Sequence, residues 1–223
     1  MSDERPPLSA SQLAAHLGDR LPSPEDLPPG GAALADAIRD LIAAAVVSDI
    51  DDADKLEVAA EARRLTDRLQ ARVREPVIAL TRHPSGWVDN LTQAGSGWWN
   101  PQSLRMRFEP LALPDPDAEP VPVEVVATCT LTDAHGGPPA RAHGGVVMTL
   151  LDEALGVAAT AAGAAGLTAG LTVRFRAGTP LGVPLELRAR YVRSDGRKRF
   201  AVGELFADGV LTAEAEGVFI APR

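Results

Sequence analysis

An apolar stretch from Gly144 to Gly166 constrains this chain more than any other feature, because it carries only one acidic pair, Asp152-Glu153. A carboxylate inside an otherwise apolar helix is expensive to bury. It usually persists because it is paired with a cation, or because a raised pKa serves a function. The stretch therefore predicts a buried core helix, rather than a membrane span, that carries a chemically useful carboxylate.

The stretch opens with His143-Gly144-Gly145. Two glycines at the start of a helix leave backbone N–H groups exposed to a ligand oxygen, and the helix dipole adds positive potential there. Their alternative role is to allow close packing of two helices. An electrophilic cradle and a tuned carboxylate are the groups needed to add water to an acyl carbon.

The spacing of these groups adds a second constraint. Asp152 follows His143 by nine residues, which is roughly 13 Å along a helix, whereas catalytic groups act about 3 Å from the reacting atoms. Two antiparallel copies of the helix could bring the glycine end of one copy to the Asp152 of the other. The sequence therefore predicts a site shared by a homodimer.

Composition limits the partners and the compartment. The 223 residues suffice for one domain with an extension. A net charge of −8 argues against nucleic acid as a partner. Cys129 is the single cysteine, and the polar N-terminus has no signal-peptide pattern, so we expect a cytoplasmic protein. His16, His83 and Cys129 lack partners at metal-ligand spacing, so we expect no metal or cofactor.

The first part of the chain predicts an extension. Residues 1–31 are rich in proline and predict an irregular tail with a short helix around Leu8–Leu17. Residues 32–48 and 51–75 have apolar positions at helical spacing, and together they form a predicted helical extension over 32–80. Isolated helices of this length are marginal in water, so they need a surface to pack against.

The second part predicts an α+β domain. Residues 83–103 are turn-rich and contain all three tryptophans, of which Trp98 and Trp99 could line an acyl pocket or cover the edge of a core. Strand patterns follow at 104–108, 123–131, 169–176, 185–193, 199–207 and 211–220. Strands, one long buried helix and then hairpin-linked strands predict an antiparallel sheet packed on a single central helix.

The residues from His143 to Ala154 strongly resemble the central helix of hotdog-fold acyl-CoA thioesterases of the phenylacetate-pathway type, in the 4-hydroxybenzoyl-CoA thioesterase superfamily. The resemblance extends, less specifically, to Gly137-Pro138-Pro139, to 171–182, to Gly196-Arg197-Lys198 and to 213–219. It covers residues 104–223, about half of the chain, and places the whole domain at 81–223.

The resemblance implies a sheet wrapped around the helix, a homodimer or dimer of dimers, and hydrolysis of acyl-CoA at the interface. Asp152 matches the catalytic carboxylate, which activates water or attacks directly, and Gly144 matches the donor to the thioester carbonyl. Thr168 matches a residue that holds the attacking water, and His143 belongs to the site as donor, acid or cap. Relatives often have an asparagine where this chain has Gly137, so another group such as His135 would have to assist.

Other residues have weaker roles in the predicted thioesterase site. Gly145 could contribute to substrate binding beside Gly144. Arg174, Arg176, Arg197 and Lys198 could contact the phosphates of coenzyme A, although strand arginines are common on protein surfaces. Glu153 lies about 100° off the catalytic face, which favours an ion pair or a polar contact.

The sequence is compatible with three functions. Thioester hydrolysis ranks first, and a non-catalytic acyl-CoA-binding protein that acts as a ligand sensor ranks second, because Gly137 departs from the family pattern. A dehydratase ranks last. We also expect the N-terminal helices to pack on the domain or its dimer partner and to cover part of the acyl tunnel.

Overall fold

The computed structural model describes residues 20–115 and 118–221, so the helix expected around Leu8–Leu17 lies outside the described residues. The N-terminal elements are η2 (Pro24–Asp26), α2 (Gly30–Val47), α3 (Asp52–Gln70), β1 (Leu80–Arg82) and β2 (Val88–Asn90). The domain that follows contains β3 (Arg107–Phe108), β4 (Glu124–Thr130), η3 (Asp133–His135), α4 (Gly144–Ala161), β5 (Leu167–Phe175), β6 (Pro184–Asp195), β7 (Lys198–Ala207) and β8 (Val210–Ile220).

The domain is a six-stranded antiparallel sheet in the order β3-β4-β6-β7-β8-β5. Two tight hairpins join β6 to β7 and β7 to β8. Gly196, Asp208 and Gly209 have positive φ at these turns, as two-residue hairpins require. The predicted hairpin-linked strands are confirmed, and so is the predicted α+β fold class.

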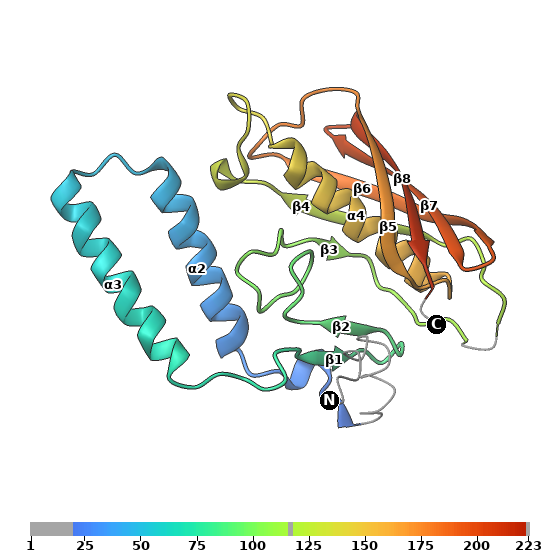
Figure 1. Ribbon diagram of the computed structural model, residues 1–223, viewed down its shortest axis with the longest axis horizontal. Helices are drawn as coiled ribbons and strands as arrows, with labels where there is room; N and C mark the ends of the chain where they lie inside the picture. The colour runs from blue at the N-terminus through green and yellow to red at the C-terminus, as the bar shows by residue number, and fades with distance from the viewer. Residues whose placement is uncertain (1–19, 116–117, 222–223) are drawn as a thin grey trace, which may run out of the picture.

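Helix α4 lies across one face of this sheet, and the sheet curves around it (Figure 1). Leu150, Leu151 and Leu155 are completely buried. Gly203 on β7 and Gly217 on β8 lie under Leu155, where a β-carbon would press against its methyl groups. The apolar character predicted from the sequence is therefore that of a core helix.

Helices α2 and α3 form an antiparallel pair (Figure 1), and α2 contacts η3 of the domain. Asp51 caps α3 by accepting a hydrogen bond from the Asp54 N–H. Among the described residues, α2 buries only Ala35 and α3 buries none. The apolar positions of α3 remain exposed, so the expectation that it packs on its own domain is wrong, and packing on a partner copy stays a prediction.

Two features of the connecting segment differ from expectation. A small sheet of β1 and β2 joins the end of the expected helical extension to the segment 83–103, which we expected to be turn-rich, and strands of three residues give no alternating pattern to detect. The strand expected from residue 104 begins only at Arg107, because Arg105 adopts a φ of 53°, which breaks the extended conformation.

Burial of α4 predicts a stability test. Leu151→Ala should lower the free energy of unfolding by about 2 to 5 kcal/mol, because it removes buried methyl groups and leaves a cavity. Leu56→Ala, on an exposed position of α3, is the matched control and should cost far less. Urea denaturation measures both changes, and equal losses would contradict the packing described here.

Candidate active site

The structure brings Asp152 and Thr168 together. The Thr168 hydroxyl donates a hydrogen bond of 2.9 Å to Asp152 Oδ1. A bulge in β5 between Thr168 and Gly170 makes this contact possible. The extra residue changes the alternation, so Thr168 and Leu171 both face α4 although they are three positions apart. A strand without the bulge would turn one of them away from the helix.

Asp152 has no basic partner within the described chain, because none of the ion pairs there includes it. The alternative in which Asp152 is a helix carboxylate neutralised by a nearby arginine is therefore not what the structure shows. The carboxylate keeps a second oxygen, Oδ2, for other contacts, since the Thr168 bond occupies Oδ1.

At the N-terminus of α4, His143 is the N-cap. Its Nδ1 accepts a hydrogen bond of 3.0 Å from the Gly145 N–H, so in the neutral ring Nε2 carries the proton and can act as a donor. The Gly145 N–H is therefore occupied within the chain. The Gly144 N–H belongs to the first helical residue, whose N–H has no intrahelical acceptor, and it is the better placed of the two to receive a ligand oxygen.

Strand β5 runs alongside α4 in the opposite direction and touches both ends of the candidate site. It starts at Leu167, next to the Asp152–Thr168 contact, and ends at Phe175, whose ring lies against Gly144. Asp152 and Gly144 thus lie beside opposite ends of β5. One copy of the chain does not bring them to a single acyl carbon.

The loop before α4 explains Gly137. Its N–H donates to the Arg141 carbonyl, and the His143 N–H donates to the His135 carbonyl, so the loop folds back on itself. A β-carbon at Gly137 would overlap the His143 backbone. The asparagine of relatives therefore cannot occupy this position without a shift of the loop.

His135 lies on the other side of this loop. Its Nδ1 accepts one hydrogen bond, of 3.0 Å, from the Thr132 backbone N–H. The same nitrogen is 3.1 Å from the Thr132 hydroxyl. Burial lowers the pKa of His135, so the ring is neutral and its Nε2 carries the proton. Assistance by His135 stays a prediction.

Glu153 is held by a segment that the sequence did not single out. Its carboxylate accepts hydrogen bonds from the Ser96 hydroxyl at 2.6 Å and from the Gln93 amide at 2.8 Å. A β-carbon at Gly95 would overlap this carboxylate. Glu153 therefore makes the polar contact expected of it, and it ties the segment 93–96 to α4 at the residue next to Asp152.

Arg174 and Arg176 lie on the face of the sheet opposite α4, because Leu171 and Val173 face the core and the side chains of a strand alternate. Arg174 is 2.9 Å from Glu216, and Arg176 is 2.5 Å from Glu214. Their charges are thus already paired across β5 and β8, away from Asp152.

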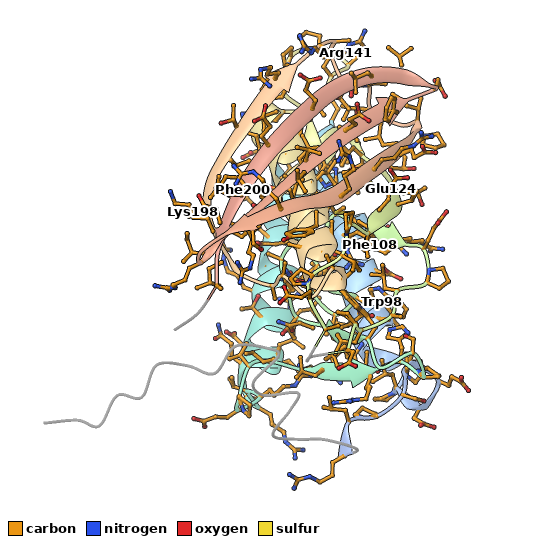
Figure 2. The ribbon with its side chains drawn as sticks, turned by 90° about the vertical axis from the view of Figure 1, so that its right-hand side faces the viewer. Trp98, Phe108, Glu124, Arg141, Lys198 and Phe200 are labelled. Atoms are coloured by element: carbon orange, nitrogen blue, oxygen red, sulfur yellow. The ribbon has the colours of Figure 1, made fainter. Side chains whose placement is uncertain are left out.

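Arg197 and Lys198 lie at the end of the sheet where β5 begins, since Lys198 and Leu167 both pair with Ile220. Figure 2 shows Lys198 at this outer end. Arg197 donates two hydrogen bonds to the Ala221 carbonyl. Of the four predicted phosphate contacts, these two are on the same end of β5 as Thr168.

The two adjacent tryptophans separate. Trp99 packs against Gly31 at the start of α2, and the guanidinium of Arg74 lies 4.9 Å from its ring centre. Trp98 is about half exposed and lines a cleft formed with α2 and the segment 103–111.

Comparison with known proteins identifies the family. The profile described as thioesterase superfamily matches residues 140–213. The crystal structure of a thioesterase superfamily protein shares 31% identity and superimposes with a TM-score of 0.73, covering 87% of this chain and 97% of that one. The chain therefore belongs to the thioesterase superfamily, and the hotdog fold that the resemblance implied is confirmed.

Two further relatives match over shorter regions. Acyl-coenzyme A thioesterase THEM4 of Xenopus laevis is 33% identical over 86 residues, which are 38% of this chain and 39% of that protein. The matched region is thus well under half of that relative. A phenylacetic acid degradation-related thioesterase structure from Ralstonia eutropha JMP134 shares 27% identity over 53% of this chain and 86% of its own, with a TM-score of 0.44.

The environment of Glu153 predicts a pH dependence. Burial, the largest cause, raises the pKa of Glu153 above its ordinary value of 4.5, and Ser96 only partly offsets this effect. The folded state then binds the proton more tightly than the unfolded chain, so stability falls as pH rises from about 4.5 through the folded pKa. In Glu153→Gln, which cannot ionise, this loss should disappear.

Urea denaturation from about pH 4 to pH 8 measures the effect. The unfolding free energy of the wild type should fall relative to that of Glu153→Gln across the lower part of the range and then run parallel to it. A difference that is constant at every pH would contradict the assignment.

Proposed function

We propose that this protein hydrolyses acyl-CoA thioesters at a site shared by two copies of the chain. Water adds to the thioester carbonyl carbon, the carbon–sulfur bond breaks, and the products are a carboxylic acid and the thiol of coenzyme A. One observation carries the proposal. On α4, Asp152 accepts a hydrogen bond from Thr168 at the start of β5, and Gly144 lies against Phe175 at the end of β5.

Strand β5 is an edge strand of the sheet, so its outer backbone groups can pair with another strand. If β5 pairs antiparallel with β5 of a second copy, the start of each strand lies beside the end of the other. Asp152 of one copy then approaches Gly144 of the other. The same pairing produces two equivalent sites, as the helix length already required.

The roles within such a site follow from the geometry. The Gly144 N–H at the positive end of α4 donates to the thioester carbonyl oxygen and stabilises the negative charge that develops there. The Nε2–H of His143 is a second donor at the same end. Asp152 of the other copy either removes a proton from water or attacks the carbonyl carbon to form an anhydride that water then cleaves.

Thr168 orients Asp152 through its hydroxyl and leaves the second carboxylate oxygen to act. On the nucleophilic route, water that attacks the Asp152 carbonyl carbon of the anhydride would leave ¹⁸O in Asp152 after a single turnover in ¹⁸O-water, and mass spectrometry would detect this label. On the general-base route, the label would appear only in the released acid. The reaction uses no metal or redox cofactor on either route.

The coenzyme A portion is proposed to lie near Arg197 and Lys198, because these residues share the end of the sheet with Thr168. Arg174 and Arg176 are paired with glutamates on the opposite face and contribute less. We propose a cytoplasmic homodimer or dimer of dimers, in which the exposed apolar positions of α3 are covered by the partner.

A non-catalytic acyl-CoA-binding protein is the second candidate. The observation that favours it is Gly137, whose close approach to His143 leaves no room for the asparagine that relatives place there. The two functions are separated by thiol release: a binding protein would retain acyl-CoA without releasing coenzyme A.

The carboxylate predicts a loss of activity. Asp152→Asn should lower kcat for acyl-CoA hydrolysis by about 10² to 10⁴, because it removes the base or nucleophile without changing the shape of the side chain. Thiol release measured with a panel of acyl-CoAs tests this. Asp208→Asn, at a hairpin turn where asparagine tolerates positive φ, is the control and should keep wild-type activity. Near-normal turnover in a folded Asp152→Asn protein would contradict the assignment.

The shared site predicts complementation. Asp152→Asn and Gly144→Leu should each be inactive alone. Mixing equal amounts under conditions that exchange subunits should restore about a quarter of the wild-type activity, because about half of the dimers are mixed and each mixed dimer has one intact site out of two. Full activity in a demonstrably monomeric wild-type protein would rule out the shared site.

A further inference from the structure

The cleft that Trp98 lines has a volume of about 800 Å³ and lies between α2, the β1–β2 hairpin and the segment 103–111. This volume is within the range of small-molecule sites. Asp152, Gly144, His143 and Thr168 do not line it, so it is distinct from the candidate active site. Figure 2 shows two of its residues, Phe108 and Trp98, below the large sheet.

Part of the cleft lining is apolar. Trp87, Leu91 and Met106 are buried beneath it, and Phe108 and Trp98 are partly exposed at its surface. Covering such a surface with an apolar or aromatic group is favourable, because it removes apolar area from water.

Arg39, on α2, is a largely buried cation in this apolar cleft. Its side chain is only 14% exposed, and burial lowers its pKa from the ordinary value. Nη1 bonds to Asp36 at 2.6 Å, and Nη2 donates to the Asn100 carbonyl at 2.7 Å. The Nε–H is buried and has no acceptor among the described residues. A buried donor without an acceptor is unfavourable, because the group has lost its hydrogen bond to water.

Arg39 shares its nearest carboxylate with a second arginine. Asp36 also pairs with Arg105, at 3.3 Å, so one carboxylate serves two guanidinium groups. Arg107 and Glu109, which also line the cleft, offset each other.

The opposite end of the cleft carries an acidic group that is already satisfied. Asp89 accepts the Trp87 indole N–H at 2.9 Å, and its second oxygen is 2.8 Å from His83 Nε2. Asp89 therefore does not compete for Arg39. The group at the cleft that lacks an acceptor oxygen is the Arg39 Nε–H on α2.

We propose that this cleft binds a small apolar or aromatic carboxylic acid, with the carboxylate near Arg39 and the apolar group between Trp98 and Phe108. The Ser96 hydroxyl, which binds Glu153, also lines the cleft. A bound acid thus lies one contact from the residue that follows Asp152. The proposal concerns binding and does not depend on hydrolysis.

Intrinsic fluorescence gives a local readout, because the three tryptophans of the chain are all in the cleft or next to it. The probes are hexanoate and 3-phenylpropanoate, each compared with its neutral amide. The wild type should bind each acid at least about tenfold more tightly than the amide, as a charge-assisted hydrogen bond provides.

Arg39→Met should lose this preference, Arg39→Lys should keep only part of it, and Arg63→Met, on the exposed α3, should behave as the wild type. Because Arg39→Met could disturb the fold, Trp98→Ala provides a second test at a half-exposed position: calorimetry should show weaker binding of both acids. Equal binding of acid and amide, unchanged binding in Arg39→Met, or no binding by the wild type would overturn the proposal. Loss of binding in Gly144→Leu would also overturn it, because the acid would then occupy the active site.

Discussion

Burial of α4 against the sheet is the interaction on which the rest of the structure depends. Leu150, Leu151 and Leu155 are removed from water completely, and the helix can rotate or slide only by exposing them. This packing fixes the direction of every other side chain on the helix. Asp152 faces β5, and Glu153, one position later, faces the segment 93–96. The same apolar contact therefore determines that Asp152 meets Thr168 and that Glu153 holds the segment 93–96.

The length of α4 sets a second constraint. A helix that is long enough to span the sheet separates its positive end from a carboxylate in its middle by more than a catalytic contact allows. In the proposed dimer, a two-fold axis beside the edge strand would place the start of one β5 next to the end of the other and so remove this separation. The bulge near Thr168 contributes to this arrangement, since it turns a residue of the edge strand toward the helix.

The sequence predicted the central helix, the hairpin turns and the large sheet because each depends on local pattern: apolar spacing, turn residues and alternation. It also named both members of the Asp152–Thr168 pair: Asp152 from its isolation in the apolar stretch, and Thr168 only through resemblance. The sequence did not reveal the contact of Ser96 and Gln93 with Glu153, because that contact joins segments about 57 to 60 residues apart and depends on a glycine that allows close approach. Pairing of Arg174 with Glu216 was hidden for the same reason, since strand register is a tertiary property.

The outer face of the sheet limits how dimers could assemble further. Arg174, Arg176 and Arg188 form ion pairs with Glu216, Glu214 and Glu186 there, at half-exposed positions that water still reaches. Stacking two such faces would strip the hydration from both partners of every pair, and the desolvation cost of buried ion pairs commonly exceeds their mutual attraction. A larger oligomer would therefore be built from other surfaces, and the back of each sheet would stay in contact with solvent.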